Sequence, residues 1–291
     1  MKFSIIIPTF NNFDYLKLCI NSIEKNSSFK HELIIHINGS DSLTEEFLIL
    51  KKYKYTKTTK NVGLCSGVNI ASRVSTTDYL VYAHDDMYFL PKWDEHLADD
   101  IDKLNNNLYY LSCTQISHYT QDKSLPNHIT YDVGKTIDDF DEEKLLKNFD
   151  KLVFHDLQGS HWAPHIIHKE LWNKVGGFSE EFDPGFGSDP DLNMKLWQHG
   201  VRIFKGVNKS RVYHFGSLTT RKKINLKRNN GRRTFLLKWK ISIDFFVKNY
   251  LKRGQIYKSE LDEPKFNFFI LVALMQCKIK YFLQLLNKKL F

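Results

Sequence analysis

The sequence predicts an α/β fold with a mostly parallel central sheet flanked by helices. Three largely apolar runs carry this prediction: Phe3 to Ile7 with only Ser4 interrupting, Leu33 to Ile37 with only His36 interrupting, and Leu80 to Ala83. Runs that are almost continuously apolar, rather than alternating, are typical of strands buried on both faces. Segments of helical periodicity separate them, as expected of strand, helix, strand units. With 291 residues and 42% hydrophobic content, the chain can bury a full core.

The first strand leads into a predicted helix. Its inward positions recur at helical spacing, namely Leu16, Cys19, Ile20 and Ile23. Asn11 or Asn12 can cap the first turn of this helix. The second strand then ends at Asn38, just before the turn residue Gly39. These elements predict one parallel strand, helix, strand unit.

Polar residues stand at the carboxyl ends of the predicted strands. Pro8 and Thr9 end the first strand, Asn38 ends the second, and Asp85 and Asp86 follow the third. Parallel strands end at one edge of a sheet, where ligands of open α/β sheets bind. Adjacent carboxylates at that edge can hold a hard divalent cation, although a simple turn explains them equally well.

The middle of the chain gives weaker signals. Gly63 and Gly67 are expected to flank a loop, because glycine permits close approach of the backbone to a ligand. A short helical stripe then consists of Val68, Ala71 and Val74. We expect a helix from about Trp93 to Leu104, and strands with a long loop over the polar residues 105–157.

Two helices are predicted in the second half. The first lies within residues 166–175, after a strand end, and closes at Gly176. In the second, Asp189 followed by Pro190 fits an N-cap followed by the first helical position. Leu192 and Leu196 would then face inward, and Gly200 would end the helix. A capping aspartate needs no catalytic role, so capping alone is an alternative explanation of Asp189.

Charge is unevenly distributed along the chain. Residues 221–291 carry 18 Lys and Arg against 4 Asp and Glu, while the net charge of the whole chain is +9. Such a segment suits an anionic surface. The four cysteines are scattered without CxxC spacing, which indicates no disulfide framework and fits a reducing compartment. The first apolar run is too short for a signal peptide, so we expect a cytoplasmic protein.

The basic segment also contains apolar stretches. Phe268 to Met275 is an unbroken apolar run of eight residues, too short to span a membrane. Two interpretations stay open. Basic amphipathic helices can lie peripherally on an anionic membrane, or the apolar positions can pack on the body of the protein while the basic residues are solvated. Nucleic-acid binding is not expected, because no recognised nucleic-acid module is visible.

Six segments resemble those of the family 2 glycosyltransferases. In chain order they are SIIIPTFNN, NGS after the second strand, KNVGLCSGVNIA, the third strand with its HDDM ending, KELWNKVGGFSEEF and SDPDLNMKLWQHGVRI. Their ordered co-occurrence over roughly residues 3–216 is far more specific than any single motif. The resemblance implies the Rossmann-like GT-A fold and transfer of a sugar from a nucleotide-sugar, often with inversion.

The resemblance also implies residues of the donor site. Pro8, Thr9 and Asn11 would contact the nucleotide. Further candidates in the matching segments are Asn38, Gly63, Asn69 and Asp85. Ile37 stands where the family often has an aspartate, so the identity of the base stays open.

A divalent ion, Mn²⁺ or Mg²⁺, would bridge the diphosphate of the donor. By resemblance, Asp86 matches the second aspartate of a DxD-like motif and would ligate the ion. His84 occupies the first position of that motif, and whether His84 or Asp85 joins Asp86 stays open. Val212 to Phe215 suggest a strand carrying His214, and a lone histidine there is usually structural. The resemblance instead matches His214 to a metal-site histidine.

For the chemistry, the resemblance matches Asp189 to the general base, with Asp191 as the second candidate and Ser188 in place of the usual acidic neighbour. We expect the helix dipole to keep Asp189 ionised. Trp162 can stack on a sugar face, but a core tryptophan is an equal interpretation.

Together these observations predict a metal-dependent, inverting glycosyltransferase with a GT-A catalytic body over residues 1–220 and a basic helical appendage over 221–291. The donor would be a UDP-sugar or dTDP-sugar, and the acceptor a hydroxyl group of a glycan or lipid-linked molecule. A non-catalytic nucleotide-sugar or glycan binder with the same fold is the alternative. A sugar nucleotidyltransferase is less favoured, because its GxGTRL-type loop is absent from the N-terminus.

Overall fold

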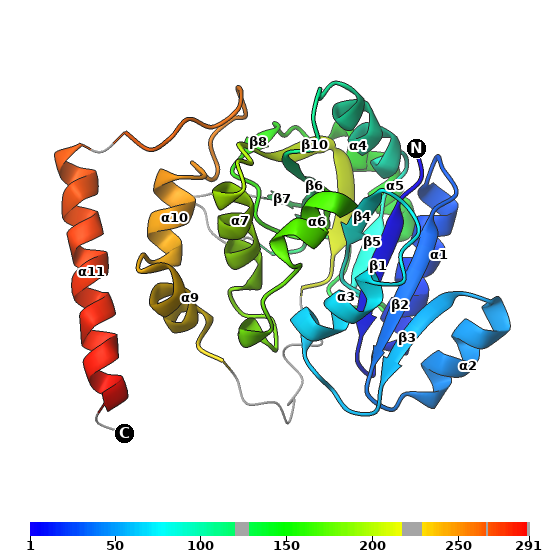
Figure 1. Cartoon of the computed structure of the whole chain (residues 1–291). Coiled ribbons are helices and arrows are strands. Elements are labelled where there is room, and N and C mark those ends of the chain that lie inside the picture. Colours follow the sequence, from blue (N-terminus) through cyan, green and yellow to red (C-terminus); the bar gives the residue numbers. More distant parts are fainter. Residues whose placement is uncertain (120–127, 217–228, 266, 290–291) are drawn as a thin grey trace.

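The computed structural model describes residues 1–119, 128–216, 229–265 and 267–289. Its centre is a ten-stranded sheet flanked by helices (Figure 1). The strands are β1 (Ser4–Thr9), β2 (Glu32–Asn38), β3 (Lys54–Thr58), β4 (Tyr79–Tyr82), β5 (Met87–Phe89), β6 (Tyr109–Ser117), β7 (His128–Thr130), β8 (Leu157–Gln158), β9 (His165–His168) and β10 (Ile203–His214). The main path of the sheet is β3-β2-β1-β4-β9-β6-β10-β5, with β7 beside β6 and β8 beside β10.

The helices alternate with the strands in the first half and follow them at the end. They are α1 (Phe13–Asn26), α2 (Ser42–Lys51), α3 (Leu64–Ser72), α4 (Trp93–Asp102), α5 (Glu142–Asn148), α6 (Lys169–Val175), α7 (Ser188–Gln198), α9 (Gly231–Trp239), α10 (Ile243–Asn249) and α11 (Phe268–Lys289). Two short 3₁₀ helices are η1 (Phe149–Lys151) and η2 (Glu180–Phe182). The α/β class predicted from the sequence is confirmed.

Strand direction determines which residues meet at the edge of the sheet. β1 pairs in parallel with β2 and β4, and β6 pairs in parallel with β10. β9 lies antiparallel between β4 and β6, so those two strands point the same way. The carboxyl ends of β1, β2, β4 and β10 therefore reach one edge, as expected of an open α/β sheet.

The predicted core positions are buried. All four inward residues predicted for α1 are buried, and so is the run from Leu80 to Ala83. Asn12 does occupy the N-cap position of α1, but its side chain makes no capping hydrogen bond. The strands expected within residues 105–157 are present as β6, buried along all nine residues, and β7, whereas the helix α5 was not predicted.

Residues 41–77 differ most from the prediction. The sequence analysis did not identify α2 or β3. Gly67 lies inside α3 rather than in a loop, and a Cβ atom there would approach Cδ2 of His36 to 2.7 Å. Glycine at this position therefore permits close packing of α3 on β2 instead of ligand approach. Val74 lies beyond the end of α3 and is exposed.

The helix that carries Asp189 begins earlier than predicted. α7 starts at Ser188, and Gly187, with φ +85°, is its N-cap residue. Asp189 is therefore the second residue of the helix and does not cap it, so the capping explanation was wrong. Leu192 and Leu196 are fully buried, as predicted. α6 also ends as predicted, with Gly176 in the left-handed conformation.

The C-terminal segment is helical, as predicted, and it has two layers. α9 and α10 pack against the body: Phe235 and Phe246 are fully buried in the same core as the sheet. α11 lies outside α9 and α10, on the side away from the sheet (Figure 1). The predicted domain boundary at residues 220 and 221 falls outside the described residues.

Candidate active site

The end of β4 and the end of β10 meet through a short reversal of the chain. After Tyr82 the backbone turns through residues 83–86 and re-enters the sheet as β5, antiparallel to β10. In this register Met87 pairs with His214. The backbone N–H of Phe215 donates to the carbonyl oxygen of Asp86 at 3.1 Å. The fold thus fixes Asp86 beside His214, as the resemblance implied.

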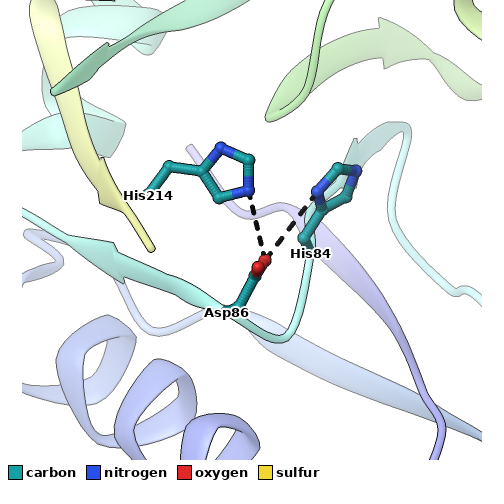
Figure 2. A group of neighbouring side chains, drawn as sticks. All are labelled: His84, Asp86 and His214. Carbon is teal, nitrogen blue, oxygen red and sulfur yellow. Dashed lines mark ion pairs between the residues drawn. The ribbon is translucent and has the colours of Figure 1, made fainter. Parts of the chain in front are cut away.

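Three side chains converge in this reversal. Nε2 of His214 lies 3.3 Å from Oδ1 of Asp86, and Nδ1 of His84 lies 3.9 Å from the same oxygen. Figure 2 shows both imidazoles directing a nitrogen toward the carboxylate. Asp86 and His214 are buried, and His84 is partly exposed. We call these three residues the HDH cluster.

The two histidines of the HDH cluster have different surroundings. Burial, together with the proximity of His214, lowers the pKa of His84 to about 4. Nδ1 of His214 lies 3.3 Å from the side-chain oxygen of Gln115, whose amide nitrogen donates to the carbonyl oxygen of Ala163. Gln115 can therefore only accept from His214, which places the proton on Nδ1 and the lone pair on Nε2, the atom facing Asp86.

The HDH cluster fits a divalent metal ion. Its three candidate ligand atoms all lie within 4.8 Å of one another. Ligands about 2.1 Å from an ion lie roughly 3 Å apart, so small side-chain adjustments are enough to bind one. Nε2 of His214 is buried and has no hydrogen-bond partner among the residues that the structure describes. Two imidazoles and one carboxylate suit Mn²⁺ and other transition metals better than Mg²⁺.

Asp85 is directed elsewhere. Its carboxylate accepts a hydrogen bond of 2.7 Å from Oγ1 of Thr9, at the end of β1. Both residues are buried, whereas Pro8 is partly exposed and Asn11 is exposed with φ +49°. The sequence left His84 and Asp85 open as partners of Asp86. The side chain of His84, not that of Asp85, is grouped with the Asp86 carboxylate.

Three other predicted donor-site residues hold loops at the same edge. Asn38 accepts from the N–H of Val62 and donates to the carbonyl oxygen of Gly63. Asn69 bonds both the N–H and the carbonyl of Phe178. At Gly63, which has φ +96°, a Cβ atom would come within 2.2 Å of the Asp183 carboxylate. The side-chain amides of Asn38 and Asn69 are thus engaged within the protein, and nucleotide contact by these residues stays a prediction.

Asp189 faces an open pocket of about 740 Å³. The pocket is lined by His161, Trp162, Phe186, Gly187, Asp189, Pro190, Asn229, Asn230, Gly231, Arg232, Ile243 and Arg253. Oδ1 of Asp189 is buried and has no hydrogen-bond partner among the described residues. Burial raises the pKa of Asp189 to about 7, so the expectation that the helix dipole keeps it fully ionised was wrong. Loss of hydration outweighs the dipole here.

Trp162 is packed as a core residue and also borders the pocket that Asp189 faces, so stacking on a sugar stays a prediction. It is 7% exposed, and its indole N–H donates to the carbonyl oxygen of Cys113 at 3.0 Å, as a core tryptophan would. Its remaining surface lines the pocket that Asp189 faces. A sugar bound in this pocket would therefore meet the indole and the carboxylate together.

Asp191, the second candidate base, serves a different purpose. It is fully buried, and its carboxylate accepts from Trp239 Nε1 at 2.7 Å and from Ser179 Oγ at 2.6 Å. Nζ of Lys238 lies 3.0 Å away. These contacts tie α7 to α9 and leave Asp189 as the better candidate for proton transfer.

Tyr82, the last residue of β4, packs beside the HDH cluster. Its ring packs edge-on against His84 at 5.4 Å between centroids. Burial, followed by the negative charge of Asp189 and, more weakly, that of Asp86, raises the pKa of Tyr82 well above its usual value. The sequence analysis did not identify Tyr82 or Gln115, because each lies within an apolar strand pattern with no motif of its own.

A family model described as glycosyl transferase family 2 matches residues 4–170, more than half of the chain. The chain belongs to glycosyl transferase family 2. This confirms the family inferred from the six motifs. The match includes β4 and the HDH residues His84 and Asp86, and it ends before Asp189 and His214.

Two relatives are named glycosyltransferases but are uncharacterized. The protein of Rickettsia typhi (strain ATCC VR-144 / Wilmington) is 29% identical over 214 residues, and that of Rickettsia prowazekii (strain Madrid E) is 28% identical over 214 residues. Each alignment covers 72% of this chain and 64% of the relative. The chain thus spans less than two thirds of the length of these relatives.

Solved structures share the fold of this family 2 member. Staphylococcus aureus TarS in complex with UDP-GlcNAc superposes with a TM-score of 0.58 at 13% identity, covering 98% of this chain and 72% of that one. GalNAc-T7 with UDP, GalNAc and Mn²⁺ has a TM-score of 0.61 at 16% identity, covering 86% and 50%. At these identities the likeness shows the GT-A fold alone, which confirms the predicted architecture.

Proposed function

We propose that this family 2 member is a metal-dependent, inverting glycosyltransferase. It would move a sugar from a UDP-sugar or dTDP-sugar to a hydroxyl group of a glycan or lipid-linked acceptor. The observation that carries the proposal is the HDH cluster, two imidazoles and one carboxylate gathered where β4 ends and β5 pairs with β10. The UDP-GlcNAc bound to TarS and the UDP and Mn²⁺ bound to GalNAc-T7 support a uridine donor.

Asp189 would act on the acceptor. A hydroxyl group entering the pocket would give its proton to Asp189 as its oxygen bonds to the anomeric carbon. The bond from that carbon to the diphosphate oxygen would break on the opposite face, which inverts the anomeric centre. The buried oxygen of Asp189 and its pKa of about 7 suit this role, because a base works best with a pKa near the operating pH.

His84, Asp86 and His214 would hold the divalent ion. A bound ion would offset the negative charge that develops on the departing diphosphate. Gln115 would keep His214 oriented through Nδ1, as outer partners of metal-binding histidines do. Trp162 would support the sugar or acceptor in the pocket.

Donor cleavage tests the proposal. The full chain is incubated with a panel of UDP-sugars and dTDP-sugars in MnCl₂, MgCl₂ or EDTA, and release of the nucleoside diphosphate is measured. We expect release with at least one donor, and its loss in EDTA. If the chain binds a nucleotide-sugar in a thermal-shift assay but releases no diphosphate with water or added glycans, the non-catalytic binder is the correct description.

A further inference from the structure

Helix α11 has two faces with opposite surroundings. Its inner face, formed by Ile270, Ala273, Leu274 and Cys277, packs toward the body, where the Cys277 thiol lies 3.6 Å from Oγ of Ser242. Near its C-terminal end, Gln284 accepts a hydrogen bond of 2.7 Å from Nε of Arg233 on α9. These contacts fix which side of α11 faces outward.

The outward face is an apolar stripe. Its residues recur every three or four positions along the helix, and they are Phe268, Leu271, Met275, Ile279, Phe282 and Leu286. Their side chains are between 51% and 73% exposed. We call these six residues the outer stripe. An apolar surface of this kind on a soluble domain marks an interaction site.

We propose that the outer stripe docks α11 flat on the surface of an anionic lipid bilayer. Charge favours lipid over a second copy of the chain, because α11 carries four lysines and no acidic residue, and residues 221–291 are strongly basic overall. Two such helices facing each other would repel, whereas anionic headgroups attract them. An in-plane helix has this composition: one apolar face with lysines beside it.

The same helix is long and apolar enough to be tested as a membrane span. Phe268–Leu286 forms a 19-residue stretch with mean hydropathy 1.5 and only 6% of its window buried. A span would place Lys278 and Lys280 near the centre of the bilayer, where charge is strongly disfavoured. It would also detach the inner face from α9 and α10. The in-plane position keeps both the lysines in water and the inner contacts intact.

This inference goes beyond the proposed function and does not depend on catalysis. It agrees with a lipid-linked acceptor, because the pocket facing Asp189 is lined by Gly231, Arg232 and Ile243, from the helices beside α11. Docking would hold that pocket close to the membrane surface.

Vesicle co-sedimentation tests the inference on the full chain. Vesicles of phosphatidylcholine alone are compared with vesicles that also contain phosphatidylglycerol, at low and high NaCl. We expect binding to the anionic vesicles, with part of it surviving high salt because the outer stripe inserts between lipids. The triple variant Leu271→Gln, Met275→Gln, Phe282→Gln should bind at least about tenfold more weakly.

The matched control changes exposed apolar residues at the opposite end of the molecule. Ile49 and Leu50 on α2 are 59% and 78% exposed. The double variant Ile49→Gln, Leu50→Gln should bind vesicles as the unchanged protein does. Both variants should keep donor cleavage, so a failure of vesicle binding and a failure of the proposed function are separate results.

Three results would overturn the inference. The first is equal vesicle binding by the triple variant and the unchanged protein. The second is a dimer in solution that ignores vesicles and that the triple variant converts to monomer, since the occupant would then be a second copy. The third is resistance of the bound protein to alkaline carbonate extraction, which indicates a spanning helix.

Discussion

Nε2 of His214 lies 3.3 Å from Oδ1 of Asp86, although the two residues come from distant parts of the chain. Their proximity follows from the pairing of Met87 with His214 and from the hydrogen bond between Phe215 and Asp86. The antiparallel strand β5 thus brings a β4 carboxylate to the end of β10. Any ligand of the HDH cluster will depend on this register.

Removal of the central carboxylate should abolish metal-dependent nucleotide binding. Asp86→Ala deletes the oxygen that both histidines face, so the affinity for UDP in MnCl₂ should fall to the level measured in EDTA. Calorimetric titration measures it. Asp138→Ala, at an exposed aspartate, is the control and should leave the titration unchanged. Unchanged, metal-dependent binding by Asp86→Ala would place the metal site elsewhere.

The HDH cluster should prefer Mn²⁺ to Mg²⁺. Two of its three ligand atoms are imidazole nitrogens, and Mg²⁺ prefers oxygen ligands. Thermal melting of the protein without nucleotide should shift upward with MnCl₂ and little with MgCl₂ at equal concentration. His84→Asp replaces one imidazole ligand with a carboxylate, so the melting shift with MgCl₂ should come closer to the shift with MnCl₂. Equal shifts by both ions in the unchanged protein contradict the proposed ligand set.

Gln115 should act as a positioning residue for His214. Gln115→Leu removes the acceptor for the His214 Nδ1 proton, so we expect Mn²⁺ affinity to fall by about 10- to 100-fold. Gln115→Glu retains an acceptor oxygen and should recover most of that affinity. A purely structural role for Gln115 predicts that both variants lower the melting temperature while Mn²⁺ affinity, titrated in the folded protein, stays the same.

Asp189→Asn should separate catalysis from folding. The amide cannot take a proton, so turnover should fall by about 100-fold or more while the affinity for UDP is retained. In the unchanged protein, kcat/KM should rise as pH increases through about 7 and then level off, because the free base is the active form. Near-normal turnover of Asp189→Asn would exclude this residue as the base.

The same carboxyl group should reduce stability at higher pH. Its folded-state pKa of about 7 exceeds the ordinary value of 3.8, so the folded protein retains a proton that the unfolded chain releases between these values. Its contribution to the free energy of unfolding therefore becomes more unfavourable as pH rises from about 4 to 7. Denaturant unfolding should show Asp189→Asn gaining stability relative to the unchanged protein across this window. A constant difference would mean the pKa is not raised.

Gly63→Ala should destabilise the protein more than Gly176→Ala. Gly176 is in the left-handed helical region, which costs an alanine about 1 kcal/mol, whereas Gly63, with φ +96° and ψ 172°, is in a region open essentially to glycine alone. At Gly63 the added Cβ would also collide with the Asp183 carboxylate, whereas at Gly176 no atom of the described residues lies within 4 Å. The collision should add about 1–3 kcal/mol to the loss. Equal losses in urea unfolding would show that the loop around Gly63 moves aside freely.

The sequence predicted the sheet edge but not the route of the chain around it. The strand, helix, strand order gives the strands one direction, so their carboxyl ends lie at one edge of the sheet. Asp85 and Asp86, which follow the third apolar run, are thereby located at that edge. The choice of His84 over Asp85 depends on side-chain direction after the turn, which spacing along the chain does not encode. Likewise, the capping pattern of Asp189 and Pro190 was outweighed by Gly187, whose left-handed conformation starts α7 earlier.

The length of α11 was also missed, for a related reason. In the linear sequence the unbroken apolar run covers only the eight residues from Phe268 to Met275, and Lys278 and Lys280 follow soon after it. On the helix both lysines lie beside the outer stripe rather than within it, and the stripe continues to Leu286. The alternative that the apolar positions pack on the body holds for α9 and α10, but not for this face of α11.

The bonds from Trp239 and Lys238 to Asp191 make α9 a brace for the helix that carries Asp189. A chain shortened to end before α9 would take both donors away from the Asp191 carboxylate and uncover it, so α7 would lose a link that holds its first turn in place. Exchange of the C-terminal segment alone would therefore replace the α9 partners of Asp191 while keeping Asp191 itself. Any chimera must carry α7 and α9 from the same parent.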